Sequence, residues 1–96
     1  MCVLLWANTG QRDALARYEE TVLALLPEHG GRVIRRVPTV PGDGEPDEIQ
    51  FLEFGCTGDI DSFMADARRT VLERERSAAI SRTEVLFLNE SPADQP

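Results

Sequence analysis

Residues 2–8 read "CVLLWAN", a short apolar run that is followed at once by the turn residues Thr9 and Gly10. A run of this length, closed by a turn, predicts a β-strand rather than a helix. Successive side chains of a strand point to opposite faces of its sheet. Here both sets are apolar, with Cys2, Leu4 and Trp6 on one face and Val3, Leu5 and Ala7 on the other. We therefore expect both faces of the sheet to be covered around this strand.

The rest of the chain alternates between helical and strand patterns. Residues 11–31 carry apolar side chains at helical spacing, and Pro27 with the two following glycines ends that helix. Residues 57–80 carry a second helical pattern whose spacing slips near Asp66, where we expect a kink or a break. Strands are predicted at 32–39, 48–56 and 82–90, with a glycine- and proline-rich loop at 40–47 and a tail at 91–96.

This order of elements, βαββαβ, is that of the ferredoxin-like sandwich, an α+β fold. Right-handed crossovers give a four-stranded antiparallel sheet of order 4-1-3-2 with two helices on one face. We expect residues 1–90 to form this single domain and residues 91–96 to form a flexible C-terminal tail. Helices on one face leave the second apolar face of the sheet open, which is unusual for a monomer. The sequence therefore predicts a homodimer in which the same face of a second copy covers it.

Composition argues against several classes of protein. The 96 residues include 17 acidic and ten basic side chains, and the net charge of −7 opposes binding to nucleic acid or to an anionic membrane. We expect neither a secretory signal nor a membrane span, which needs about 20 apolar residues. One histidine and two cysteines do not make a four-ligand zinc site, and "PGDGEP" at 41–46 lacks the Lys-Ser/Thr of a phosphate loop. We expect a cytoplasmic protein that uses no metal and no cofactor.

Several motifs match a known family, namely "HGGR" at 29–32, Arg36, Glu53–Phe54, "SFMADARR" at 62–69 and "AISRTEVL" at 79–86. In these motifs the chain resembles the dimeric α/β-barrel superfamily, and within it a small bacterial domain-of-unknown-function family with an HGGR turn. The resemblance implies two ferredoxin-like sheets packed face to face. It also implies relatives among cofactor-free monooxygenases, polyketide cyclases, muconolactone isomerases and haem enzymes. None of their diagnostic residue sets maps onto this chain, and Ala67 stands where family members often have proline.

His29 is the only histidine and the first candidate site residue. Strands 32–39 and 48–56 are expected to be antiparallel neighbours, which places His29 near Cys56 and Asp59. The histidine could then act as a general base and the cysteine as a nucleophile, or the histidine could contact a ligand or a dimer partner. We favour a structural reading, in which a glycine supplies a left-handed C-cap, His29 caps helix carbonyls and Cys56 is a packed thiol. Asp59 or Asp61 is the expected N-cap of the following helix.

Glu53 is a charged residue in an otherwise apolar strand, and Arg35 or Arg36 on the neighbouring strand is its expected partner. They would form a buried or interfacial ion pair, or Glu53 would be a carboxylate of raised pKa that faces a cavity. Other side chains could fill the core or line a cavity between sheet and helices, and Asn8 could cap a helix or orient a ligand. The predicted pocket set is Trp6, Asn8, Tyr18, Phe54, Cys56, Phe63 and Met64.

Two functions of different classes fit these patterns. The first is a small homodimeric protein that binds a small apolar or aromatic ligand in an accessory role. The second is a cofactor-independent cyclase, isomerase or monooxygenase that acts on a polyketide-like or aromatic substrate, with His29, Glu53 and Arg36 as its catalytic residues. An enclosed cavity of drug-like size with two or more convergent polar side chains would favour the enzyme, whereas a filled core would favour the binding protein.

Overall fold

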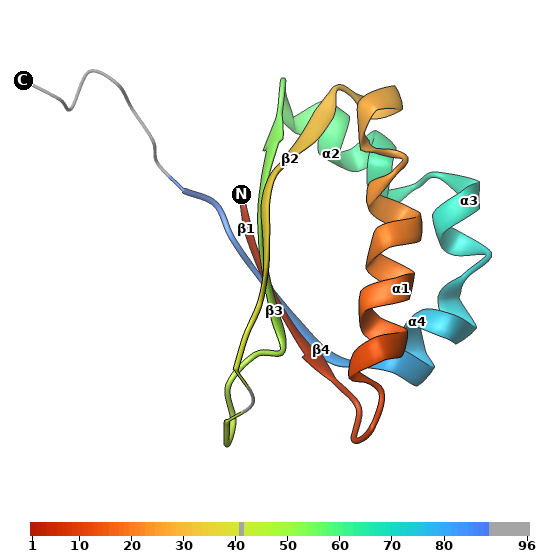
Figure 1. Cartoon of the computed structure of the whole chain (residues 1–96). Coiled ribbons are helices and arrows are strands. Elements are labelled where there is room, and N and C mark those ends of the chain that lie inside the picture. The colour runs from red at the N-terminus through yellow and green to blue at the C-terminus, as the bar shows by residue number, and fades with distance from the viewer. Residues whose placement is uncertain (41, 89–96) are drawn as a thin grey trace, which may run out of the picture.

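In the part of the chain that the structure describes, the helices all lie on one face of a four-stranded antiparallel sheet, and the other face carries none (Figure 1). The structure is a computed structural model that describes residues 1–40 and 42–88. The strands are β1 (Cys2–Ala7), β2 (Gly31–Pro38), β3 (Glu48–Phe54) and β4 (Ile80–Leu86). The helices are α1 (Arg12–Leu23), the 3-10 helix η1 (Leu26–His29), α2 (Thr57–Met64), α3 (Ala67–Thr70) and α4 (Glu73–Ala79). The predicted tail at 91–96 and the end of the predicted strand 82–90 lie outside the described residues.

The strands follow the order β2-β3-β1-β4 across the sheet, which is the order 4-1-3-2 when it is counted from the β4 edge. All three strand pairs are antiparallel. Together with the helices on a single face, this is an α+β fold of a ferredoxin-like kind. The strand β1 lies at the centre of the sheet between β3 and β4.

The face of the sheet that the helices cover, called here the inner face, carries the core. Val3 and Leu5 of β1 are buried and form one cluster with Leu15, Val22 and Leu26 from α1 and η1. The opposite face, called here the outer face, carries the alternate side chains of β1. The alternation of side chains along residues 2–7 therefore decides which side chains of β1 enter the core.

The first helix is shorter than its sequence pattern predicts. It ends at Leu23, and the chain continues into η1, whose first turn contains Pro27. Gly30 ends η1 in the left-handed conformation with φ of 69°, as expected for a glycine C-cap. A side chain is excluded there for a second reason, because an added Cβ would lie 2.6 Å from Oδ2 of Asp59.

The second helix is broken into α2, α3 and α4, and the break expected near Asp66 is confirmed. Asp66 is the N-cap of α3, where its carboxylate accepts the backbone N–H of Arg68 at 2.8 Å. The prediction of Asp59 or Asp61 as N-cap of the first of these helices is wrong, since Cys56 holds that position. Asp59 stands three residues later and its carboxylate accepts the Cys56 N–H at 3.2 Å, so it supports the cap from inside the helix.

A β-bulge in β2 sets which arginines face the helices. The register with β3 shifts between Val33 and Arg35, so that Arg35 lies opposite Phe51 and Arg36 lies opposite Gln50. Opposed residues in a sheet share a face. Arg36 is thereby directed to the inner face and Arg35 to the outer face.

Candidate functional site

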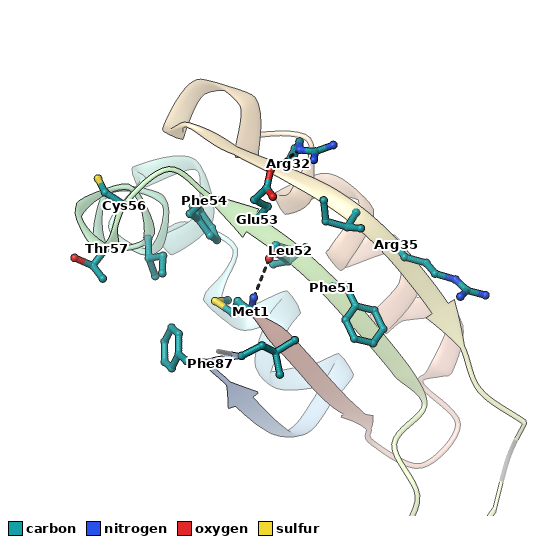
Figure 2. Close-up of a pocket in the computed structure, with 13 residues that line it drawn as sticks. Met1, Arg32, Arg35, Phe51, Leu52, Glu53, Phe54, Cys56, Thr57 and Phe87 are labelled. Carbon is teal, nitrogen blue, oxygen red and sulfur yellow. Dashed lines mark hydrogen bonds and ion pairs between the residues drawn. The ribbon is translucent and has the colours of Figure 1, made fainter. Parts of the chain in front are cut away.

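A hollow of about 710 Å³ lies on the outer face, along β2 and β3 and beside the start of α2. We call it the outer hollow. Figure 2 shows Arg32, Arg35, Phe51 and Glu53 along the two strands, with Phe87 on the other side of Met1. Its lining residues are Met1, Arg32, Ile34, Arg35, Phe51, Leu52, Glu53, Phe54, Cys56, Thr57, Ile60, Phe87 and Leu88.

Glu53 lies in the outer hollow, but its partner is Arg32, whose Nε donates to Oε1 of Glu53 at 2.7 Å. The prediction of Arg35 or Arg36 as its partner is wrong, because the register of β2 and β3 places Arg32 directly opposite Glu53. Both side chains are more than half exposed. An exposed ion pair of this kind contributes at most about 1 kcal/mol, so Glu53 is not the buried charge that its sequence context suggested.

The buried charge of β3 is Glu48. Arg36 donates from Nε and Nη2 to the two carboxylate oxygens of Glu48, at 2.9 and 3.0 Å. Gln50 donates from Nε2 to Glu48 at 2.7 Å and to Oε1 of Glu19 at 2.8 Å. Glu19, Glu48 and Gln50 are all buried, so a polar network runs through the core from β2 to α1.

Sequence reasoning missed this network, although a signal for it was present. Glu19 falls four residues after Leu15 and three before Val22, which is the apolar stripe of α1. Glu48 and Gln50 precede Leu52 at intervals of two residues, which assigns them to the same face of β3. Polar residues at three core positions predict a buried network, since such groups are buried only when they are paired.

A second and smaller cavity, of about 80 Å³, lies between the inner face and the helices. We call it the inner cavity. Its walls are mostly apolar, with five polar side chains among them: Glu19, Gln50, Arg69, Arg76 and Thr83. The apolar lining is Met1, Val3, Leu5, Val22, Leu23, Leu52, Phe63, Met64 and Val85.

The charged side chains that border the inner cavity differ in how fully their hydrogen-bonding groups are paired. Burial raises the pKa of Glu19, and its hydrogen bond from Gln50 opposes that shift. Arg76 donates from Nη2 to Oγ1 of Thr83 at 3.1 Å. Arg69 stacks its guanidinium over the Phe63 ring at 4.9 Å, yet its buried Nε has no acceptor within the part of the chain that the structure describes.

His29 lies apart from both cavities. Its Nδ1 is 2.6 Å from Oγ of Ser62, and its Nε2 is 2.7 Å from Oδ2 of Asp66. The His29 ring thus connects η1 to the junction between α2 and α3. The sequence had predicted instead that His29 caps the carbonyls at the end of its own helix. Arg68 also donates to Asp66, and the hydrogen bonds from Arg68 and His29 hold the pKa of that carboxyl well below its usual range.

Serine, histidine and aspartate in hydrogen-bonded series can activate a serine nucleophile. Here neither the outer hollow nor the inner cavity is lined by His29, Ser62 or Asp66. Ser62 also lies within α2, where backbone N–H groups bond along the helix and none beside it is left to stabilise an oxyanion. We therefore assign these three residues to holding the helices together, and call them the histidine lock.

The other predicted site residues are spread over the molecule. Trp6 donates from Nε1 to the carbonyl of Gly44 at 3.0 Å, and Arg82 covers its ring. Asn8 donates its amide to the carbonyls of Ser77 and Ala78, so it caps the end of α4 rather than the start of the first helix.

Three places hold the rest of the predicted set. Tyr18 is buried in the core cluster. Phe54 and the exposed thiol of Cys56 border the outer hollow, whereas Phe63 and Met64 border the inner cavity. The predicted catalytic residues His29, Glu53 and Arg36 are not brought together: they lie in the histidine lock, the outer hollow and the buried network respectively.

Within residues 1–40 and 42–88, no three His, Cys, Asp or Glu side chains are grouped so that they could hold a metal ion. No helix in the same residues has both the length and the apolar character that crossing a membrane requires.

Comparison with known proteins shows which solved structures share this fold, and it does not identify an activity. No family model matches the chain, and no curated protein sequence matches it. Among solved structures, it is similar to the RPA0582 protein of unknown function from Rhodopseudomonas palustris. The TM-score is 0.73 and the sequence identity is 16%, and the match covers 95% of this chain and 81% of that chain. The methylated RPA0582 protein gives a TM-score of 0.74 at 16% identity, with 95% and 79% of the two chains covered. At this identity the likeness shows a shared fold alone.

The histidine lock predicts a specific loss of stability in acid. Because the folded-state pKa of Asp66 is lowered, its contribution is present above the unfolded value of 3.8 and is lost as the pH falls through and below it. We expect Asp66→Asn to be less stable than the natural protein at pH 7, and the difference to shrink between about pH 5 and pH 2. Urea unfolding at each pH measures this difference in the free energy of unfolding. Asp61→Asn, at an exposed site on the neighbouring helix α2, is the control, and an equal effect of both variants would contradict the lock.

The buried network predicts the opposite pH dependence at Glu19. Because burial raises its folded-state pKa, the stability that protonation provides is complete below the unfolded value of 4.5 and is lost as the pH rises through the folded value. Glu19→Gln keeps an acceptor for Gln50 and does not titrate. We expect this variant to gain stability over the natural protein as the pH rises from 4 to 7, measured by urea unfolding, while the exposed neighbour Glu20→Gln shows no such trend. A Gln variant that is less stable at pH 7 would refute the assignment.

Proposed function

We propose that this chain is a small homodimeric protein that binds a small apolar or aromatic ligand in its inner cavity and serves in an accessory role. The observation that carries the proposal is the inner cavity itself, whose lining is mostly apolar with five polar side chains among it. Sites for small molecules have this composition, since apolar walls supply affinity and a few polar groups fix the orientation.

The size of the cavity supports a binding role over an enzyme for large substrates. Its volume of about 80 Å³ is well below the roughly 300–1,000 Å³ of sites for drug-sized ligands. A ligand of few heavy atoms suits this volume, whereas a polyketide-like substrate does not. The outer hollow is larger and runs along β2 and β3 on the outer face (Figure 2).

The dimer part of the proposal is supported by the outer face of the sheet. Ile34 and Leu86 are about half exposed there, at 50% and 51%, although both are large and apolar. The strand register places Leu4, Ile49, Phe51, Val37 and Cys2 on the same face. Exposed apolar side chains of this kind mark an interaction surface, and a second copy of the same face is the simplest cover. A domain of this size also gains core from such an interface.

Membership in the dimeric α/β-barrel superfamily, with its HGGR family, is part of this proposal, and the ferredoxin-like arrangement supports it. A cytoplasmic location is proposed with it, because reduced thiols are maintained there and both Cys2 and Cys56 are free.

A second candidate is a cofactor-independent isomerase, cyclase or monooxygenase acting on a small aromatic substrate. It is favoured by Glu19, a carboxyl whose pKa is raised by burial and which borders the inner cavity, as a general acid or base would. Glu19 would then replace the predicted set of His29, Glu53 and Arg36. Turnover without added cofactor, lost in Glu19→Gln while ligand binding persists, would favour this candidate.

The ligand-binding proposal predicts saturable changes confined to the inner cavity. Titration with small aromatic and branched aliphatic compounds should shift the methyl NMR signals of Val22 and Leu23, which border it. The signals of Ile34, in the outer hollow, serve as the internal control. Shifts that appear only at Ile34, or that fail to saturate for every compound, would contradict binding in the inner cavity.

The dimer proposal predicts that one charged residue introduced on the outer face prevents dimer formation. Ile34→Asp should give a monomer at micromolar concentration in light scattering, because a buried carboxylate without a partner is strongly unfavourable in an apolar interface. The matched control is Val40→Asp, which adds the same charge at a residue that is 85% exposed and lies beyond the end of β2. A natural protein that is already monomeric at this concentration would defeat the proposal.

A further inference from the structure

The outer face carries unlike charges on its two edge strands. Arg35 extends from the edge strand β2 (Figure 2), and it takes part in none of the ion pairs among the described residues. Glu84 lies on β4, at the opposite edge of the sheet, and faces the same way. Its partner in the same copy is Arg82, whereas Arg32 on β2 pairs with Glu53. In the described part of the chain, one edge of this face therefore holds an arginine without a carboxylate, and the other edge holds a carboxylate.

The strand register aligns the side chains of the outer face in rows that cross the sheet. One row runs from Arg35 on β2 to Leu86 on β4, and the next row runs from Val37 to Glu84. Neighbouring rows are two residues apart, which is about 7 Å along a strand. Arg35 and Glu84 therefore occupy opposite ends of neighbouring rows, and the width of the sheet keeps them apart within one copy.

A half turn that packs two outer faces together can take one of two directions relative to the strands. Around an axis along the strands, β2 of one copy lies over β4 of the other and every row keeps its level. Arg35 then comes within one row of the partner's Glu84, so opposite charges meet. Around an axis across the strands, β2 lies over β2, and Arg32 and Arg35 of one copy face the same arginines of the other. Like charges that face each other across an interface are unfavourable, so the axis along the strands is favoured.

The same direction also matches the apolar features of the outer face. The outer hollow of about 710 Å³ lies along β2 and β3, with Ile34 and Phe51 in its lining. Leu86 is 51% exposed on the outer face of β4 and belongs to the row of Arg35. With β4 placed over β2, the partner's Leu86 comes over the outer hollow beside Ile34. Both apolar side chains then leave water, which favours this packing.

We infer that two copies of this chain dock with β2 of each over β4 of the other, so that Arg35 pairs with the partner's Glu84 and the partner's Leu86 enters the outer hollow. This inference rests on the proposed dimer and specifies how its copies are arranged. Twofold symmetry repeats the contacts, so each dimer has two such ion pairs. Glu84 also keeps Arg82, because the two oxygens of a carboxylate accept from more than one donor. The apolar contacts supply most of the affinity, and the ion pairs select the arrangement.

Charge reversal at the two positions tests the arrangement. Arg35→Glu and Glu84→Arg each place like charges opposite one another at two points of the interface, so each should raise the dimer Kd about tenfold or more. Light scattering of the natural protein and of each variant over a micromolar concentration series measures this Kd. Arg74→Glu makes the same change in net charge as Arg35→Glu at an exposed position on α4, and it should leave the Kd unchanged.

Mixing the two charge-reversal variants adds a second measurement. In a dimer with one copy of each, both introduced charges face an opposite charge, so the mixture should dimerise with about the natural affinity. Native mass spectrometry identifies this dimer, because its mass differs from that of either variant's own dimer. Recovery also shows that both variants fold, so the loss of dimer in each variant alone would not come from misfolding.

The outcomes separate this inference from the dimer proposal beneath it. A natural protein that is monomeric throughout the concentration series would overturn both. A natural dimer that Arg35→Glu leaves unchanged or tightens would overturn the arrangement alone, as would two weakened variants whose mixture stays monomeric. The dimer would then stand with another arrangement of its copies.

Discussion

The strand β1 is apolar on both faces, and the helices cover only one of them. Its position at the centre of the sheet fixes the rest of the architecture. Val3 and Leu5 anchor the core beneath α1, which leaves Cys2, Leu4 and Trp6 to the outer face. Because the hydrophobic effect acts on both faces alike, the same strand that builds the core also supports the proposed interface on the outer face. The fold and the proposed dimer therefore have one physical origin.

The interior is unusual in holding a polar network where a small domain needs apolar contact. Glu48, Gln50 and Glu19 join Arg36 across three elements, from β2 to α1. Such groups are costly to bury, and a charged pair gains little over an apolar one unless it fixes a specific arrangement. Here the network orients Glu19 at the inner cavity, and Arg69 approaches the same space from α3. The interior polarity is thus concentrated where a ligand would be oriented.

Much of the fold could be predicted from local patterns, and the site could not. The glycine C-cap at Gly30 and the break at Asp66 follow from local chemistry, because conformation and capping depend on near neighbours in sequence. The predicted partner of Glu53 was wrong because the pairing depends on the register between β2 and β3, which the bulge between Val33 and Arg35 shifts by one residue and which a sequence pattern cannot resolve. His29 reaches Ser62 and Asp66, more than 30 residues away, for the same kind of reason.

The sequence by itself determined the elements, their order and the two apolar faces of β1, since alternation and helical spacing are written directly in the order of residues. Only the tertiary structure decided which charges meet. Arg32 rather than Arg35 or Arg36 pairs with Glu53, and Arg69 comes to border the same cavity as Glu19. These contacts arise from side chains on separate elements, whose distances are fixed by packing angles and strand register rather than by any local preference. A site built from such contacts becomes visible only when the elements are placed in space.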